Sequence, residues 1–259
     1  MNTIDPFDSS HRKMDRSKKH FLDLDGKVST FVQSNPYHRV VDPHPEKANH
    51  EIHKVKPVRE LSGELNDIGD VFGEFVQNLR SALDNAAYSI AIAVGKCNPK
   101  NCAFPFAGSL DKMPSALGRC ADLPNEIQSL FVGFQPYNGG DDVLCAINQA
   151  CNTDKHCTVV PAFTLFVREQ VAVRGTRFFE MPLKHKWDST KNEMILMTLG
   201  PGAPDDVKYD FQFTAFITLD KIEAVRGQPI LTAAHAMGCK VQSILMAIEA
   251  EARRLKIVP

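Results

Sequence analysis

One long run of apolar residues at helical spacing constrains this chain more than any other feature. Between Glu60 and Val94, apolar side chains recur every three or four residues, which places them on one face of an α-helix. A stripe of that length has to pack against other elements, because exposed apolar surface is costly in water. The spacing therefore predicts one long helix over residues 60–94. The stripe consists of Leu65, Ile68, Phe72, Phe75, Leu79, Leu83, Ala86 and Ile90.

Further helices and a group of strands follow from the same reasoning. After Cys157 the apolar residues follow a period close to two, which is typical of antiparallel strands joined by hairpin turns, over about residues 158–220. The stretch NPYHRVVDPHPEKANHEIHKVKPV (35–58), which is rich in Pro and His, predicts two short extended segments. Helices followed by strands and one last helix indicate an α+β fold. The further helices are expected at about residues 17–33, 124–134, 140–155 and 230–255.

The 259 residues are enough to bury one sizeable core. Residues 1–18 are polar and lack periodicity, so a disordered tail is expected there. The remaining residues 19–259 are expected to form a single domain. Its helical, bundle-like part covers about residues 19–157, and an antiparallel meander sheet with a C-terminal helix covers about residues 158–259.

Composition argues against several functional classes. A formal net charge of -1 gives no global attraction to nucleic acid or to anionic membranes. No apolar run approaches the roughly 18 residues that span a bilayer, and the first residues do not resemble a secretory signal. The seven cysteines are an odd number at irregular spacing, which favours reduced thiols in a cytoplasm. No cofactor is expected, because the turn GPGAPDD lacks the lysine of a phosphate-binding loop.

A polar cluster between two helices is the leading candidate for a site. On the helix expected at 140–155, Asp154 falls on the face of the inward-pointing apolar residues. A carboxylate there needs a partner, because an isolated buried charge is costly. The long helix offers Arg80 and Asp84 on one flank of its stripe, and an Arg fork can hold two carboxylates. The other candidate members are Asn78, Asn152, Lys155 and His156.

Two interpretations of this cluster differ in function. In the first, which we favour, the cluster is a structural clasp that fixes the register of two helices, and the protein has no assignable activity. In the second, the cluster is an active site. Its catalytic residues would be Arg80, Asp84, Asp154 and His156, and its ligand-binding residues Asn78, Asn152 and Lys155.

Four short motifs resemble a family of uncharacterised bacterial proteins. They are NLRSALDN (78–85), FPF (104–106), QPY (135–137) and NTDKH (152–156), in this order and spacing. The resemblance covers roughly residues 20–163 and implies no established function. The chain departs from the family pattern at Asn85, where a His is expected, and at Cys157, where an Arg is expected.

The R-S-A-L-D-H pattern expected of that family is also similar to the Arg-x4–6-His motif of HEPN-type RNases, which are helical bundles that often dimerise. That similarity implies a metal-independent RNase in which Arg80 binds the scissile phosphate and a His moves the proton of the attacking 2′-hydroxyl. Asn85 cannot transfer a proton, so His156 would take that role. An RNA substrate and a homodimer are expectations of this alternative.

Metal binding, thiol catalysis and protein binding are further alternatives. A zinc site would need a second close cysteine pair beside the C-x4-C pair, so no metal is expected. His156 and Cys157 are sequence neighbours whose side chains diverge in a helix or a strand, so a cysteine nucleophile is not expected there. A protein-binding module would use the sheet face or the loop at 96–123. Two sets of residues were considered as possible metal ligands. The first is Cys97, Cys102, Cys151, His156 and Cys157, and the second is His38, His44, His50 and His53.

Overall fold

The computed structural model confirms an α+β fold with antiparallel sheets, and the chain forms two compact units. Each unit has a hydrophobic core of its own, and the single domain expected over residues 19–259 stays a prediction. The structure describes residues 5–96, 99, 102–154, 162–173, 178–188, 190–202 and 207–259. The helical unit comprises Met1–Lys27, Leu65–Ala162 and Ile217–Pro259, and the sheet unit comprises Val28–Glu64 and Phe163–Phe216.

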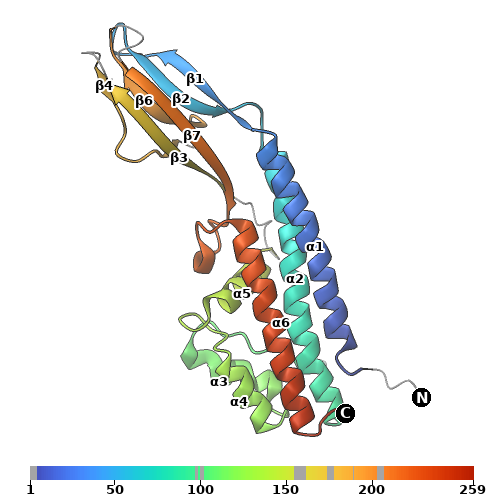
Figure 1. The fold of residues 1–259 in the computed structure, drawn as a ribbon. Helices are drawn as coiled ribbons and strands as arrows, with labels where there is room; N and C mark the ends of the chain where they lie inside the picture. Colours follow the sequence, from blue (N-terminus) through green and yellow to red (C-terminus); the bar gives the residue numbers. More distant parts are fainter. Residues whose placement is uncertain are drawn as a thin grey trace. The chain divides into compact units, whose positions relative to one another are not determined.

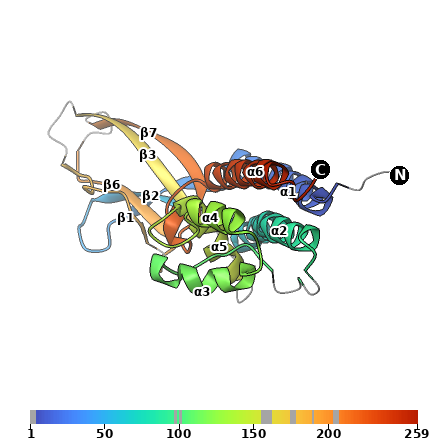
Figure 2. The ribbon, with the colours of Figure 1, turned by 90° about the horizontal axis from the view of Figure 1, so that it is seen from below.

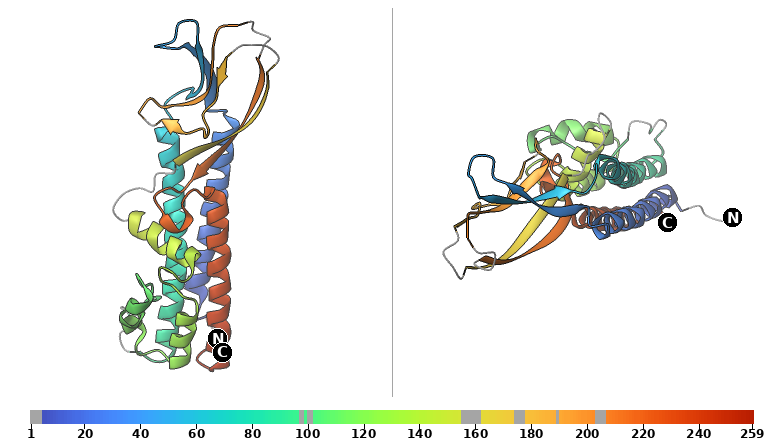
Figure 3. Two further views of the ribbon diagram at one scale, coloured as in Figure 1. Left: turned by 90° about the vertical axis from the view of Figure 1, so that its left-hand side faces the viewer. Right: turned by 90° about the horizontal axis from the view of Figure 1, so that it is seen from above.

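Three long helices run side by side through the helical unit (Figure 1). They are α1 (Asp8–Gln33), α2 (Ser62–Ala93) and α6 (Ile230–Arg254), of which α1 and α2 continue beyond this unit. The start of α1 and the end of α6 lie at the same end of the bundle, so these two helices are antiparallel (Figure 3). Three shorter helices flank the long ones (Figure 2), namely α3 (Met113–Leu117), α4 (Asn125–Gly133) and α5 (Asp142–Asp154). Short 3₁₀ turns cover Leu110–Lys112, Gly118–Cys120 and Glu223–Val225.

The first helix begins nine residues before the helix that the sequence predicts at 17–33, so residues 8–18 are helical and not a disordered tail. Its buried residues recur at steps of three, four and seven, which is the spacing of a packed helix face. Two positions of this face are serines, which hide the pattern from a search for apolar residues. Ser17 satisfies its hydroxyl by donating to the carbonyl of Met14. The face consists of Phe7, Ser10, Met14, Ser17, Leu24, Val28 and Phe31.

The stripes of α2 and α6 are buried as the sequence predicts. Within α6, the residues Ile230, Ala234, Met237, Val241, Ile244 and Ile248 are buried on one side. Among the described residues, α6 is the one helix long and apolar enough to cross a membrane, and 39% of its apolar window is buried in the protein. The buried side of α6 is accounted for by packing in the bundle.

The sheet unit contains two sheets instead of one meander. In the larger sheet, β2 (Glu51–Pro57) lies between β1 (Tyr37–Pro43) and β6 (Glu193–Leu199), all antiparallel. The other side of β6 pairs with two short strands, β4 (Phe179–Glu180) and β5 (Trp187–Asp188). The segment between them contains a proline and several lysines, which keeps it from forming one long strand. The smaller sheet pairs β3 (Ala162–Val173) with β7 (Val207–Thr218).

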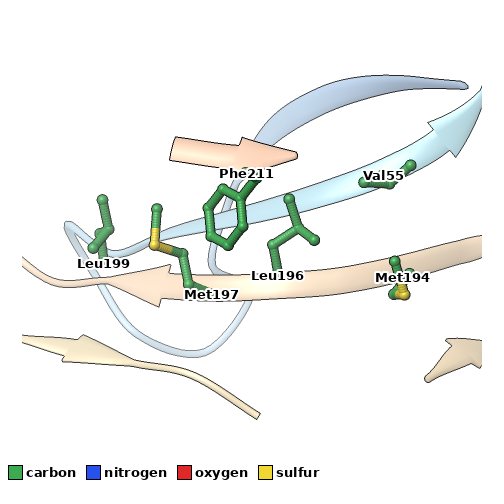
Figure 4. Packing of buried hydrophobic residues seen from close by; sticks show 6 residues of the cluster. All are labelled: Val55, Met194, Leu196, Met197, Leu199 and Phe211. Atoms are coloured by element: carbon green, nitrogen blue, oxygen red, sulfur yellow. The ribbon is translucent and has the colours of Figure 1, made fainter. Parts of the chain in front are cut away.

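The core of the sheet unit joins the two sheets through side chains of β2, β6 and β7 (Figure 4). Phe211 of β7 extends toward Leu196 and Met197 of β6, and Val55 of β2 closes one end of the cluster. The full cluster is Val55, Met194, Leu196, Met197, Leu199 and Phe211.

Beside this core, β1, β2 and β6 share an ion network centred on Lys54. Its Nζ lies 3.2 Å from Asp42 and 3.1 Å from Glu193, and the Glu193 side chain is only 6% exposed. Lys56 also contacts Glu193, at 3.3 Å. Burial lowers the pKa of Lys54, but the hydrogen bonds to Glu193 and Asp42 outweigh burial and raise it. The hydrogen bond from Lys54 lowers the pKa of Asp42.

We expect Lys54→Met to lower the free energy of unfolding by about 2–3 kcal/mol at neutral pH, because Glu193 is left with Lys56 alone. The stabilisation from Asp42 is present above its ordinary pKa and disappears as the pH falls through its lowered pKa. We measure the free energy of unfolding in urea at about pH 7 and at about pH 3. The difference in this free energy between the parent protein and Lys54→Met should be smaller at the lower pH. Lys47→Met, at an exposed ion pair, serves as the control. A difference that does not shrink in acid would contradict this account.

Candidate functional site

The structure brings Arg80 and Asp84 together one turn apart on α2 and adds partners that the sequence did not indicate. The Arg80 Nη1 donates to Asn148 Oδ1 of α5 at 2.6 Å, and Nε lies 4.0 Å from Asp84 Oδ2. The guanidinium also lies over the ring of Phe106, 4.9 Å from its centroid. Asp84 Oδ1 accepts the backbone N–H of Phe104 at 3.0 Å. The cluster therefore ties α2 to α5 and to the segment around Phe104.

The other predicted members are placed less centrally. Asn78 is buried, and its amide donates to the carbonyl of Glu74 within α2. Asn152 is exposed, and its amide lies 3.5 Å from Asn148. Asp154 ends α5, and its side chain, like Lys155 and His156, lies outside the described residues. Asn148 is the residue that the sequence reasoning missed, although it stands one turn before Asn152.

The contacts of Arg80 link α2 to α5 and to the segment around Phe106. Its side chain is 18% exposed, and its guanidinium is occupied by an amide, a carboxylate and an aromatic ring. An RNase mechanism needs a proton-transferring imidazole beside this guanidinium, and the residue expected for it, His156, lies outside the described residues. The RNase hypothesis therefore stays a prediction.

We expect Arg80→Met to lower the free energy of unfolding by about 1–3 kcal/mol, because it removes the hydrogen bond to Asn148 and the contact with Phe106. Asp84 still accepts the backbone N–H of Phe104 in this variant, so losing the positive charge beside it adds little to the destabilisation. A double-mutant cycle with Asn148→Ala should give a coupling energy of about 1 kcal/mol between the two positions. Arg16→Met, on the exposed side of α1, is the matched control. Additive effects of the two substitutions on the free energy of unfolding would contradict a stabilising interaction between Arg80 and Asn148.

A second place in the helical unit has the form of a ligand site, a groove between α1 and α6. The antiparallel helices are held in register where His11 Nε2 lies 3.1 Å from Glu249 Oε1 and where the rings of Phe21 and His235 lie 6.3 Å apart. Between these two contacts the helices leave a cavity of 510 Å³, open to solvent. We call it the α1/α6 groove. Its lining residues are Met14, Ser17, Lys18, Phe21, Leu22, Phe75, Ala234, His235, Gly238, Cys239, Gln242, Ser243 and Met246.

The floor of the groove is aromatic and its walls are apolar. Phe75 of α2 is buried below it and lies 6.1 Å from the ring of Phe21. Gly238 faces Phe75, and a Cβ atom at this position would lie 3.9 Å from its Cζ, which is an ordinary contact distance. The groove is therefore open at this point because α6 carries no side chain there.

Both helices contribute polar side chains to the groove. His235 and Cys239 stand one turn apart on α6, with the Cys239 Sγ 3.9 Å from Nδ1 and 3.8 Å from Nε2 of the imidazole. Both side chains are exposed. Since His11 meets Glu249 and Phe21 meets His235, the antiparallel register places Lys18 of α1 opposite this part of α6.

The sequence reasoning missed the groove for two reasons. One of its walls is the first half of α1, whose sequence predicts a disordered tail. The i, i+4 spacing of His235 and Cys239 was a readable signal, but their pairing becomes informative only beside a cavity.

The remaining cysteines and histidines take other roles where the structure describes them. Cys102 and Cys120 are buried, and their thiols lie near the carbonyls of Ala87 and Ala103. Interaction with the Cys102 thiol and burial both raise the pKa of Cys120. Cys97, His156 and Cys157 lie outside the described residues, and within the described part no three His, Cys, Asp or Glu side chains are grouped to hold a metal.

In the β1–β2 hairpin, the histidines contact protein groups. His44 Nδ1 accepts the backbone N–H groups of Glu46 and Lys47, both at 3.1 Å. His53 is buried, and its Nδ1 lies 3.1 Å from the hydroxyl of Tyr209. Packing against the second sheet explains this burial.

No protein-family model, curated protein or solved structure matches this chain. The resemblance to an uncharacterised bacterial family therefore stays a prediction, and function has to be argued from the geometry alone.

Proposed function

We propose that the protein binds a small amphipathic molecule, with a hydrocarbon body and an anionic head group, in the α1/α6 groove. The observation that carries this proposal is an open apolar cavity of 510 Å³ with an aromatic floor and a few polar side chains on both lining helices. Ligand sites are typically clefts of roughly 300–1,000 Å³ with apolar walls and a few polar groups that orient the ligand.

Exposed apolar side chains at the groove support a bound hydrocarbon. Leu22 is 70% exposed and Met246 is 62% exposed, although both stand on helices that have a buried face available. Contiguous exposed apolar surface on a monomer is costly and commonly marks a binding site. A hydrocarbon body lying between α1 and α6 would cover both side chains.

The charges at the groove favour an anionic head group. Lys18 and His235 line it, and no Asp or Glu side chain is among its lining residues. Lys18 has an ion pair with Asp15 at 3.4 Å, but both side chains are more than 60% exposed, so this pair contributes little and Lys18 can turn to a ligand. A carboxylate or a phosphate would meet the Lys18 cation and displace Asp15 from it.

The cytoplasm of a bacterium is the proposed location. The five described cysteines are free thiols, four of them buried, which suits a reducing compartment. This location belongs to the proposal and would give the protein access to acyl metabolites.

The first test uses decanoate as the probe in isothermal titration calorimetry. We expect saturable binding to the parent protein and none to Gly238→Leu, whose side chain would occupy the space above Phe75. Gly238→Ala is the matched control, because it adds one methyl group at ordinary contact distance and stabilises the helix by about 1 kcal/mol. Binding that survives Gly238→Leu would place decanoate elsewhere. A dimer that Gly238→Leu dissociates would identify a second copy as the occupant.

The second test concerns the head group. We expect Lys18→Gln to weaken decanoate binding by about two- to fivefold, the effect of one exposed ion pair. Binding of decan-1-ol, which has no charge, should be unchanged within error in the same variant. Lys19→Gln, the neighbouring lysine outside the groove, is the control for net charge. Equal weakening by Lys18→Gln and Lys19→Gln would contradict a specific head-group contact.

A further inference from the structure

We infer that Cys239 is an acylation site, at which its thiol accepts the acyl group of an acyl thioester whose chain lies in the α1/α6 groove. This inference rests on the proposed function, because the same groove has to hold the chain. It adds a covalent reaction and names the substrate class as long-chain or medium-chain acyl thioesters.

A thiol and an imidazole in contact at the edge of an apolar cavity carry this inference. The Cys239 Sγ lies 3.9 Å from Nδ1 and 3.8 Å from Nε2 of His235, and the inference requires one of these distances to shorten when the thioester binds. His235 itself contacts Phe21 across the groove, at 6.3 Å between ring centroids. Cys239 and His235 both line the groove, so the carbonyl of a thioester bound in it can lie beside the thiol.

Accessibility separates Cys239 from the other described thiols. Cys102, Cys120, Cys145 and Cys151 are buried, and Cys239 alone among the described cysteines is exposed. Burial raises the pKa of Cys145 to about 11, which keeps it protonated and unreactive at neutral pH. Reaction at Cys239 needs no opening of the core.

The reaction is redox-neutral and requires only the thioester. His235 takes the proton of the Cys239 thiol, and the sulfur attacks the thioester carbonyl to form a new C–S bond. The attack gives a tetrahedral intermediate, which re-forms the carbonyl as the C–S bond to the carrier breaks, and the carrier thiolate takes the proton from the imidazolium. The products are S-acyl Cys239 and a free carrier thiol, with the chain already in the groove.

The experiment uses S-decanoyl-N-acetylcysteamine with the full-length protein and locates the adduct by peptide mass spectrometry. We expect a decanoyl group on the Cys239 peptide that hydroxylamine removes, and none on that peptide in Cys239→Ser. At saturating thioester, His235→Ala should acylate at least roughly tenfold more slowly. Added imidazole should restore the rate, which a purely structural role of His235 would not allow.

Decanoate binding, measured in parallel, separates the two proposals. If decanoate binds but Cys239 is acylated no faster than N-acetylcysteinamide in the same buffer, the acylation site is overturned and the proposed function stands. Acylation that continues at the parent rate in Gly238→Leu also overturns it, because the chain would then not need the groove. If decanoate does not bind at all, the proposed function and this inference both fail.

Discussion

The packing of long helices along faces spaced by three and four residues is the constraint on which the helical unit depends. Each of α1, α2 and α6 buries one such face, and none of these faces would be stable in water alone. Contacts at two points, between His11 and Glu249 and between Phe21 and His235, hold α1 and α6 in register. The Arg80–Asn148 hydrogen bond then attaches α5 to α2.

The α1/α6 groove results from the way these helices pack. Ala234 and Gly238 are small residues on the side of α6 that faces Phe75, so the helices approach without filling the space between them. A larger side chain at Gly238 would turn the groove into ordinary core. Keeping a glycine inside a long helix costs about 1 kcal/mol relative to alanine, which is consistent with a use for the open space.

The sequence predicted the long helices after residue 60 to within a few residues, because apolar periodicity is strongest where a face is both long and buried. It failed on the first half of α1, where Ser10 and Ser17 stand at buried positions, and on strand order, which depends on contacts distant in sequence. For the site, residue spacing placed Arg80 beside Asp84 but could not identify Asn148. Cavities and cross-helix neighbours are properties of the folded chain, so the spacing of His235 and Cys239 could not by itself indicate the groove.

The interleaving of the two units has a consequence for how the chain folds during synthesis. The β1–β2 hairpin forms from neighbouring residues, but β6, which completes its sheet, is made more than a hundred residues later. Likewise, the part of the α2 face that packs against α6 stays uncovered until α6 is made, more than a hundred residues after α2. A nascent chain therefore exposes part of the α2 face and an unpaired β2 edge until β6 and α6 have been synthesised, and in that interval it is open to aggregation and to chaperone binding.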